Sequence, residues 1–140
     1  MNKAAALKVL LVEPANLLRR SVAITVGSLG TAEVTEAATY ATAEQLCERQ
    51  RFNGAVVALD WPPESGVCRG LSLIQRIRAG DSPSAPSIPI AALVDSCNAE
   101  LLQVLRACGI SRILIKPFRV RDVIDTIDGM RAPAPARTGQ

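Results

Sequence analysis

Histidine is absent from the 140 residues of this chain. Its absence excludes the commonest general base and metal ligand of enzyme sites, and the chain cannot itself form a phosphohistidine. Aromatic residues make up only 3% of the sequence, whereas 49% of the residues are hydrophobic. We therefore expect a core built mainly from Leu, Ile, Val and Ala.

Long apolar runs are also missing. No stretch reaches the ~18 apolar residues of a membrane span, and the residues before the first apolar run are too few for a signal peptide. The cysteines are widely separated and form no C-x-x-C pair; they are Cys47, Cys68, Cys97 and Cys108. This pattern indicates free thiols in a reducing compartment. We expect a cytoplasmic protein that does not associate with membranes.

The charge shows little bias. Sixteen basic and 13 acidic residues are interspersed and give a net charge of +3, with no block of Lys and Arg. Such a surface favours ordinary solvation over nucleic-acid binding. The glycines form no phosphate-binding loop motif.

Five short apolar runs alternate with five segments of helical periodicity. The predicted strands are 8–12, 32–37, 55–59, 88–94 and 112–115, and the predicted helices are 16–29, 42–50, 71–79, 98–108 and 119–130. This alternation predicts an α/β domain with a parallel sheet and helices on both faces. The domain should span residues 1–130, followed by a disordered Ala/Pro-rich tail over 131–140.

Local signals place several helix ends. Asn16 and Asn98 suit N-cap positions, and Thr42 with Gln45 forms a capping-box pattern. Gly30 suits the position just after the first helix.

Charged residues follow three predicted strands. Glu13-Pro14 follows the first, Asp60 and Trp61 follow the third, and Lys116-Pro117-Phe118 follows the fifth. Because the carboxyl ends of parallel strands meet at one edge of a sheet, a pocket is expected there, with Trp61 at its rim.

With Lys116-Pro117-Phe118 after the fifth strand, the chain resembles the receiver domain of bacterial two-component response regulators from about Leu7 to Met130. The resemblance implies a flavodoxin-like (βα)5 three-layer sandwich with strand order 2-1-3-4-5. It also implies a cis Lys116–Pro117 bond. The family's site holds two Mg²⁺-binding acids after strand one, a phospho-accepting Asp at the end of strand three, a Ser/Thr after strand four and a Lys after strand five.

Most of that site is replaced when it is carried over by spacing. Glu13 keeps one acid, Pro14 replaces the other, and Val94 stands at the hydroxyl position 22 residues before Lys116. Ala58 stands at the acceptor position, 44 residues after Pro14.

The acceptor position has one alternative. With Ala58 as the acceptor position, Pro62 and Ser65-Gly66 also match the family's spacing, whereas a register on Asp60 needs a two-residue shift and loses both matches. We favour Ala58, which has no oxygen to form an acyl phosphate. Glu13 alone should hold Mg²⁺ poorly. Under the alternative, Asp60 would accept the phosphoryl group and Glu13 would assist Mg²⁺.

Without a phosphoryl group to bind, Lys116 needs another partner. We expect it to form an ion pair with Glu13, Asp60 or Asp95. Glu13, Asp60, Glu64 and Asp95 could also gather as a cation site, although their scattered spacing and the absence of His make this a weaker hypothesis. A small-ligand or nucleotide sensor that uses the same crevice is another.

The leading hypothesis is a stand-alone degenerate receiver, a pseudo-receiver, that is no enzyme and needs no cofactor. It would act in signal transduction through a protein partner, such as a histidine kinase or another signalling protein. The expected binding face, over residues 100–130, presents Arg106, Arg112, Ile113, Arg119 and Arg121, and a homodimer through it is a further option. Ile113, where the family has an aromatic residue, is expected to serve packing.

Overall fold

The computed structural model describes residues 7–64 and 66–131. Five strands and five helices alternate along the chain: β1 Lys8–Val12, α1 Asn16–Leu29, β2 Glu33–Ala37, α2 Tyr40–Arg49, β3 Gly54–Ala58, α3 Arg69–Arg78, β4 Ile90–Val94, α4 Ala99–Ala107, β5 Arg112–Ile115 and α5 Val120–Arg131. All four strand pairings are parallel, and the strand order is β2-β1-β3-β4-β5. The predicted fold class is confirmed. Within the described residues, none of the helices has the length and apolar character of a membrane span.

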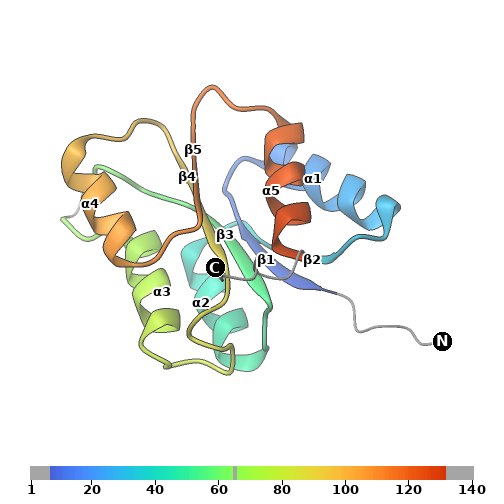
Figure 1. Ribbon diagram of the computed structural model, residues 1–140, viewed down its shortest axis with the longest axis horizontal. Helices are drawn as coiled ribbons and strands as arrows, with labels where there is room; N and C mark the ends of the chain where they lie inside the picture. The colour runs from blue at the N-terminus through green and yellow to red at the C-terminus, as the bar shows by residue number, and fades with distance from the viewer. Residues whose placement is uncertain (1–6, 65, 132–140) are drawn as a thin grey trace, which may run out of the picture.

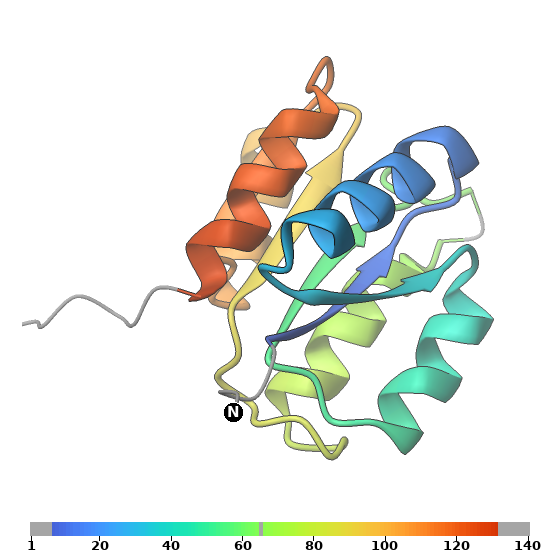
Figure 2. The same cartoon turned by 90° about the vertical axis from the view of Figure 1, so that its right-hand side faces the viewer.

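The sheet lies between two helical layers (Figures 1 and 2). Helices α1 and α5 cover one face, and α2, α3 and α4 cover the other. Alternation along β1 explains this division, because successive side chains of a strand point to opposite faces. Val9 packs with Val22 of α1 and Val123 of α5, whereas Leu10 packs with Ala43 of α2 and Ile74 of α3. The central strands are therefore apolar on both faces, and polar groups collect at the strand ends.

The ends of α1 were predicted in part. Gly30 follows the helix with a φ of 71°, in the left-handed region that favours glycine, as expected. The predicted N-cap at Asn16 is wrong, because Ala15 occupies the extended N-cap position and Asn16 is the first helical residue. The Asn16 side chain instead accepts a hydrogen bond from Arg19 Nη2 at 2.7 Å.

The predicted capping box at Thr42 and Gln45 is also wrong. Thr39 is the N-cap of α2, and its Oγ1 accepts from the Thr42 backbone N–H at 3.1 Å. The helix therefore begins two residues before Thr42. In α4 the prediction is confirmed, since Asn98 Oδ1 accepts from the Leu101 backbone N–H at 2.8 Å.

Several other boundaries differ by one or two residues from the predicted ranges. β3 covers Gly54–Ala58, one residue earlier than predicted, and β4 begins at Ile90. α3 begins at Arg69, and its Gly70 packs closely on the chain after β3, where a Cβ would lie 2.8 Å from Leu59 Cδ2. Arg131 belongs to α5 and not to the predicted tail. The predicted tail residues 132–140 lie outside the described part.

Candidate functional site

Sheet register brings the predicted site residues to one edge. Val12 of β1 pairs with Val57 of β3, and Val94 of β4 pairs with Ile115 of β5. The next residue on each strand continues this alignment, so Glu13 lies beside Ala58, and Lys116 lies beside Asp95. The Lys116 backbone N–H donates to the Val94 carbonyl at 3.0 Å, which fixes the start of the β5–α5 loop.

A cavity of about 230 Å³ opens at this edge. Every residue of the predicted vestigial pocket lines it: Glu13, Pro14, Ala58, Asp60, Val94 and Lys116. Tyr40, Leu59, Leu93, Asp95 and Phe118 complete its wall. The wall is formed by the last residues of β3 and β4 and by residues that follow β1, β3, β4 and β5, as expected for a pocket outside the carboxyl ends of a parallel sheet.

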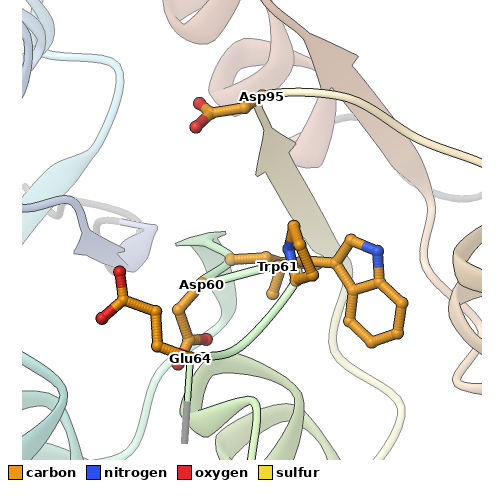
Figure 3. Close-up of a pocket in the computed structure, with 6 residues that line it drawn as sticks. Asp60, Trp61, Glu64 and Asp95 are labelled. Atoms are coloured by element: carbon orange, nitrogen blue, oxygen red, sulfur yellow. The ribbon is translucent and has the colours of Figure 1, made fainter. Parts of the chain in front are cut away.

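A second cavity, of about 430 Å³, adjoins the first and shares three residues with it. Its wall consists of Leu59, Asp60, Trp61, Pro62, Glu64 and Asp95 (Figure 3). The carboxylates of Asp60, Glu64 and Asp95 lie on one side in this view, and the Trp61 ring lies on the other. Trp61 thus lines the pocket, as its position after the third strand suggested.

Asp60 is held by the start of α3. Its Oδ1 accepts from Gly70 N–H at 3.1 Å and from Cys68 Sγ at 3.0 Å, and its Oδ2 accepts from Arg69 N–H at 2.9 Å. Both carboxylate oxygens therefore satisfy donors that a helix N-terminus leaves free. Burial opposes ionisation, but the hydrogen bonds from Cys68, Gly70 and Arg69 outweigh it and lower the pKa of Asp60 below its ordinary value. Burial and then the Asp60 contact raise the pKa of Cys68 to about 11.

Tyr40 covers the end of β3, which nothing in the sequence pattern indicated. It is the first residue of α2, and its hydroxyl donates to the Ala58 carbonyl. The Arg69 guanidinium lies over its ring, 5.9 Å from the centroid. Burial first, and then the negative charge of Asp60, raise the pKa of the phenol. A neutral tyrosine therefore closes the α2 side of the smaller cavity.

Glu13 is almost wholly buried, with 6% of its surface exposed. Its Oε2 accepts from the Ala15 N–H at 2.8 Å, and its backbone carbonyl accepts from Arg19 Nη1 at 2.9 Å. Arg19 also forms an ion pair with Glu36 at 3.0 Å, which ties α1 to β2. These contacts fix the position of the first strand end.

Lys116 pairs with Asp95, one of the three acids proposed for it. Nζ lies 3.0 Å from Asp95 Oδ1, and the hydrogen bond to Asp95 raises the pKa of Lys116. Both side chains are exposed, at 60% and 73%, so the pair should add little to stability. The Lys116–Pro117 peptide bond is cis, as the resemblance implies, and so is Trp61–Pro62.

Solved structures resemble this chain over most of its length. The Vibrio cholerae chemotaxis protein CheY4 is 25% identical with a TM-score of 0.72, and the match covers 90% of this chain and 99% of that one. The chain has the receiver fold. A CheY-like receiver domain from Methanospirillum hungatei is 18% identical with a TM-score of 0.70, over 90% of this chain and 97% of that one. No protein-family model matches the sequence, and no curated protein shows significant similarity to it.

Another solved structure of the same fold contains bound ligands. A Burkholderia pseudomallei response regulator, solved with a phosphorylated aspartic acid, a calcium ion and citrate, is 21% identical with a TM-score of 0.66. The match covers 86% of this chain and 65% of that one.

The side chains at the strand ends do not fit Mg²⁺. This ion prefers near-octahedral oxygen ligands, usually including carboxylates. Pro14 and Ala58 offer no side-chain oxygen, and both oxygens of Asp60 already accept hydrogen bonds. Across residues 7–64 and 66–131, no three metal-ligating side chains gather into a site.

The predicted partner face is exposed around β5. Arg106, Arg112, Arg119 and Arg121 all have exposed side chains, and Ile115 is 49% exposed. Ile113 instead packs in the cluster that includes Leu101 and Leu105 of α4. Ile113 therefore serves packing, and the exposed apolar residue of this strand is Ile115.

Proposed function

We propose that this protein is a degenerate receiver domain that acts in two-component signalling by binding a protein partner without being phosphorylated. The observation that supports this most is the identity of the residue at the end of β3. Ala58, which carries only a methyl group, is the last residue of β3, and by the family's spacing we take it as the acceptor position. Because Ala58 lacks an oxygen nucleophile, no phosphoryl group can be attached there.

Asp60 is a poor substitute as the acceptor. It lies two residues beyond the end of β3, and its two oxygens hold the first turn of α3. Attack on a phosphoryl donor would require one oxygen to give up its helix contacts. Val94 also offers no hydroxyl for the phosphoryl group.

The partner, by this proposal, is a histidine kinase or another signalling protein, and the face formed by α4, β5 and α5 contributes to binding. Four exposed guanidinium groups and the exposed Ile115 support this assignment, since arginine and apolar residues are favoured in protein interfaces. A homodimer through the same face remains part of the proposal.

Phosphoryl transfer can be tested directly. The purified protein is incubated with acetyl phosphate and Mg²⁺, and its intact mass is measured beside that of a phosphorylatable protein of the same fold. We expect no mass gain. A phosphoryl adduct that forms on the wild type and is lost in Asp60→Asn would overturn the proposal. Fluorine NMR of the protein with beryllofluoride tests independently whether a phosphoryl analogue binds.

A further inference from the structure

Two further cavities lie at the opposite end of the strands from the candidate site. They measure about 210 and 360 Å³, and they adjoin, because Pro89, Ser111, Gly129 and Met130 line both. The last turns of α5 form one wall, and the residues that lead into β4 and β5 form the other (Figure 2). We call the joined cavities the α5 groove.

Gly129 keeps the α5 groove open. It lies inside α5, where a glycine costs stability relative to alanine. A Cβ at Gly129 would meet no atom within 4 Å, so the packing of residues 7–64 and 66–131 does not require glycine at this position. The missing side chain leaves room for another segment to approach the backbone of the helix.

The other wall of the α5 groove carries free hydrogen-bond donors. Arg78 has five N–H groups, and backbone carbonyls of the two adjoining loops accept four of them. Within the described part of the chain, the remaining N–H on Nη2 has no acceptor, and neither has the hydroxyl of the exposed Ser87. Arg112 supplies further donors. A segment that suits this wall therefore brings hydrogen-bond acceptors.

We propose that the α5 groove binds the Ala/Pro-rich segment 132–140 of the same chain. The segment begins directly after Arg131, the last residue of α5, and so starts at the rim that Met130 forms. Pro133 and Pro135 have no N–H, and proline-rich segments favour an extended helix whose carbonyls have no internal partners. These carbonyls are the acceptors that the groove lacks. A tethered segment also has an effective concentration on the order of millimolar.

Charge and reach agree with this occupant. Asp125 is the one acid among the described residues that line the α5 groove, and Arg137 is the one charged residue of the segment. Asp125 lies six residues before the end of α5, or about 9 Å along the helix. Six extended residues beyond Arg131 span up to about 19 Å. The segment can therefore reverse direction after α5 and still bring Arg137 to Asp125.

NMR relaxation of the full chain tests the proposal. Ala132, Ala134 and Ala136 carry amide protons, and their order parameters separate a bound segment from a free one. We expect values above about 0.6, whereas a free segment falls below this. We also expect nuclear Overhauser effects between the ring protons of Pro133 or Pro135 and the methyl group of Met130. Both signals should be unchanged when the protein is diluted tenfold, because the segment binds its own chain.

Gly129→Ala is the decisive variant, because its methyl group enters the α5 groove. The order parameters of the three alanines should fall below about 0.6. Gly27→Ala is the matched control: it makes the same change within α1, where a Cβ also meets no atom within 4 Å, and it should leave the segment bound. Both variants should raise the thermal midpoint of unfolding, since alanine favours a helix over glycine. A released segment in Gly129→Ala is then no result of unfolding.

Arg137→Gln tests the contact with Asp125. The bound fraction, read from the chemical shifts of the three alanines, should correspond to binding weakened about two- to fivefold, as expected for a partly exposed ion pair. An unchanged bound fraction would exclude that contact and overturn the proposed position of the segment.

Other results would overturn the proposal as a whole. Order parameters below about 0.6 in the wild type, or equal effects of Gly129→Ala and Gly27→Ala, would each do so. Loss of the signals on dilution would assign the bound segment to a second copy of the chain instead. None of these measurements depends on phosphoryl transfer, so the proposed function is tested separately.

Discussion

Asp60 acts as a capping group for α3, although it lies eight residues before Cys68. Its carboxylate accepts from the Arg69 and Gly70 backbone N–H groups, which have no partners inside the helix. Negative charge at this end also interacts favourably with the helix dipole. The charge of Asp60 therefore stabilises the fold at the place where catalysis would have required it to be free.

Asp60→Asn should lower the free energy of unfolding at neutral pH by about 1 kcal/mol, the usual scale for loss of a capping interaction. The folded protein lowers the pKa of Asp60 from 3.8. Its carboxylate therefore stabilises the protein fully at pH values above 3.8, and this contribution disappears as the pH falls through the lower, folded value. Urea unfolding at several pH values measures both effects, and the variant should show a smaller loss of stability in acid.

Asp81→Asn provides the comparison. Its side chain is exposed and makes no hydrogen bond or ion pair within residues 7–64 and 66–131, so its unfolding curve should match that of the wild type. If Asp60→Asn is as stable as Asp81→Asn at neutral pH, the capping role is wrong.

Single residues of the site were predictable only where spacing along the chain decides their position. Spacing placed Glu13, Ala58, Val94 and Lys116 at one edge, because strand ends determine that edge. It gave no information on Tyr40, whose role depends on how α2 packs over β3. Nor could spacing show that Asp60 binds helix amides, because that depends on the path of the intervening loop.

Arg78 connects the end of α3 to two loops that precede β4 and β5, at the opposite end of the strands from the candidate site. Its guanidinium donates to the carbonyls of Pro86, Ile88, Cys108 and Gly109 at 2.6–3.0 Å. Burial lowers the pKa of Arg78, since these neutral acceptors replace water. One side chain thus holds the α3–β4 and α4–β5 connections against the end of α3.

Arg78→Gln should reduce the free energy of unfolding by about 2 kcal/mol, because four carbonyls, two of them in part-buried hydrogen bonds, lose a charged donor. Arg76→Gln on the same helix is the matched variant. Within residues 7–64 and 66–131, Arg76 pairs with the exposed Glu48 alone, at 3.3 Å, so its loss should cost less than about 0.5 kcal/mol. Chemical denaturation of both variants tests the difference, and equal losses would show that the Arg78 contacts contribute little.

The bounds of strands and helices were predicted well where a run of apolar residues determines them. They were predicted poorly where a capping residue determines where a helix begins. The bounds of β1 and β5 were predicted to the residue, because each is a short apolar run bounded by polar or turn residues. The start of α2 was wrong, since the sequence offers Thr39 and Thr42 as candidates and only the extended backbone at Thr39, with a φ of −135°, decides between them.

The molecule as a whole carries opposite charges on two of its surfaces, the edge at the strand ends and the predicted partner face. The edge at the strand ends is acidic, whereas the predicted partner face displays the exposed Arg106, Arg112, Arg119 and Arg121 and the exposed Ile115. The largest exposed apolar residues elsewhere include Ile24 on α1, which is 58% exposed. Charge therefore distinguishes the two surfaces.

Self-association tests the second surface. If a homodimer forms through the face of α4, β5 and α5, Ile115→Lys should abolish it, because it adds a charge at the exposed apolar residue of a face that already carries four exposed arginines. Ile24→Lys, which makes the same change on the face of α1, should leave the dimer intact. Sedimentation equilibrium measures both. A wild type that stays monomeric at its highest soluble concentration, or equal effects of the two variants, would exclude the homodimer and leave the face to another protein.

The hydrogen bond from Tyr40 to the Ala58 carbonyl has a mechanical consequence. It fastens the first residue of α2 to the last residue of β3, and Arg69 of α3 stacks on the same ring. An outward swing of α2 would break both the hydrogen bond to the Ala58 carbonyl and the contact with Arg69. The rim of the cleft is consequently a rigid frame, whose shape an approaching molecule meets ready-made.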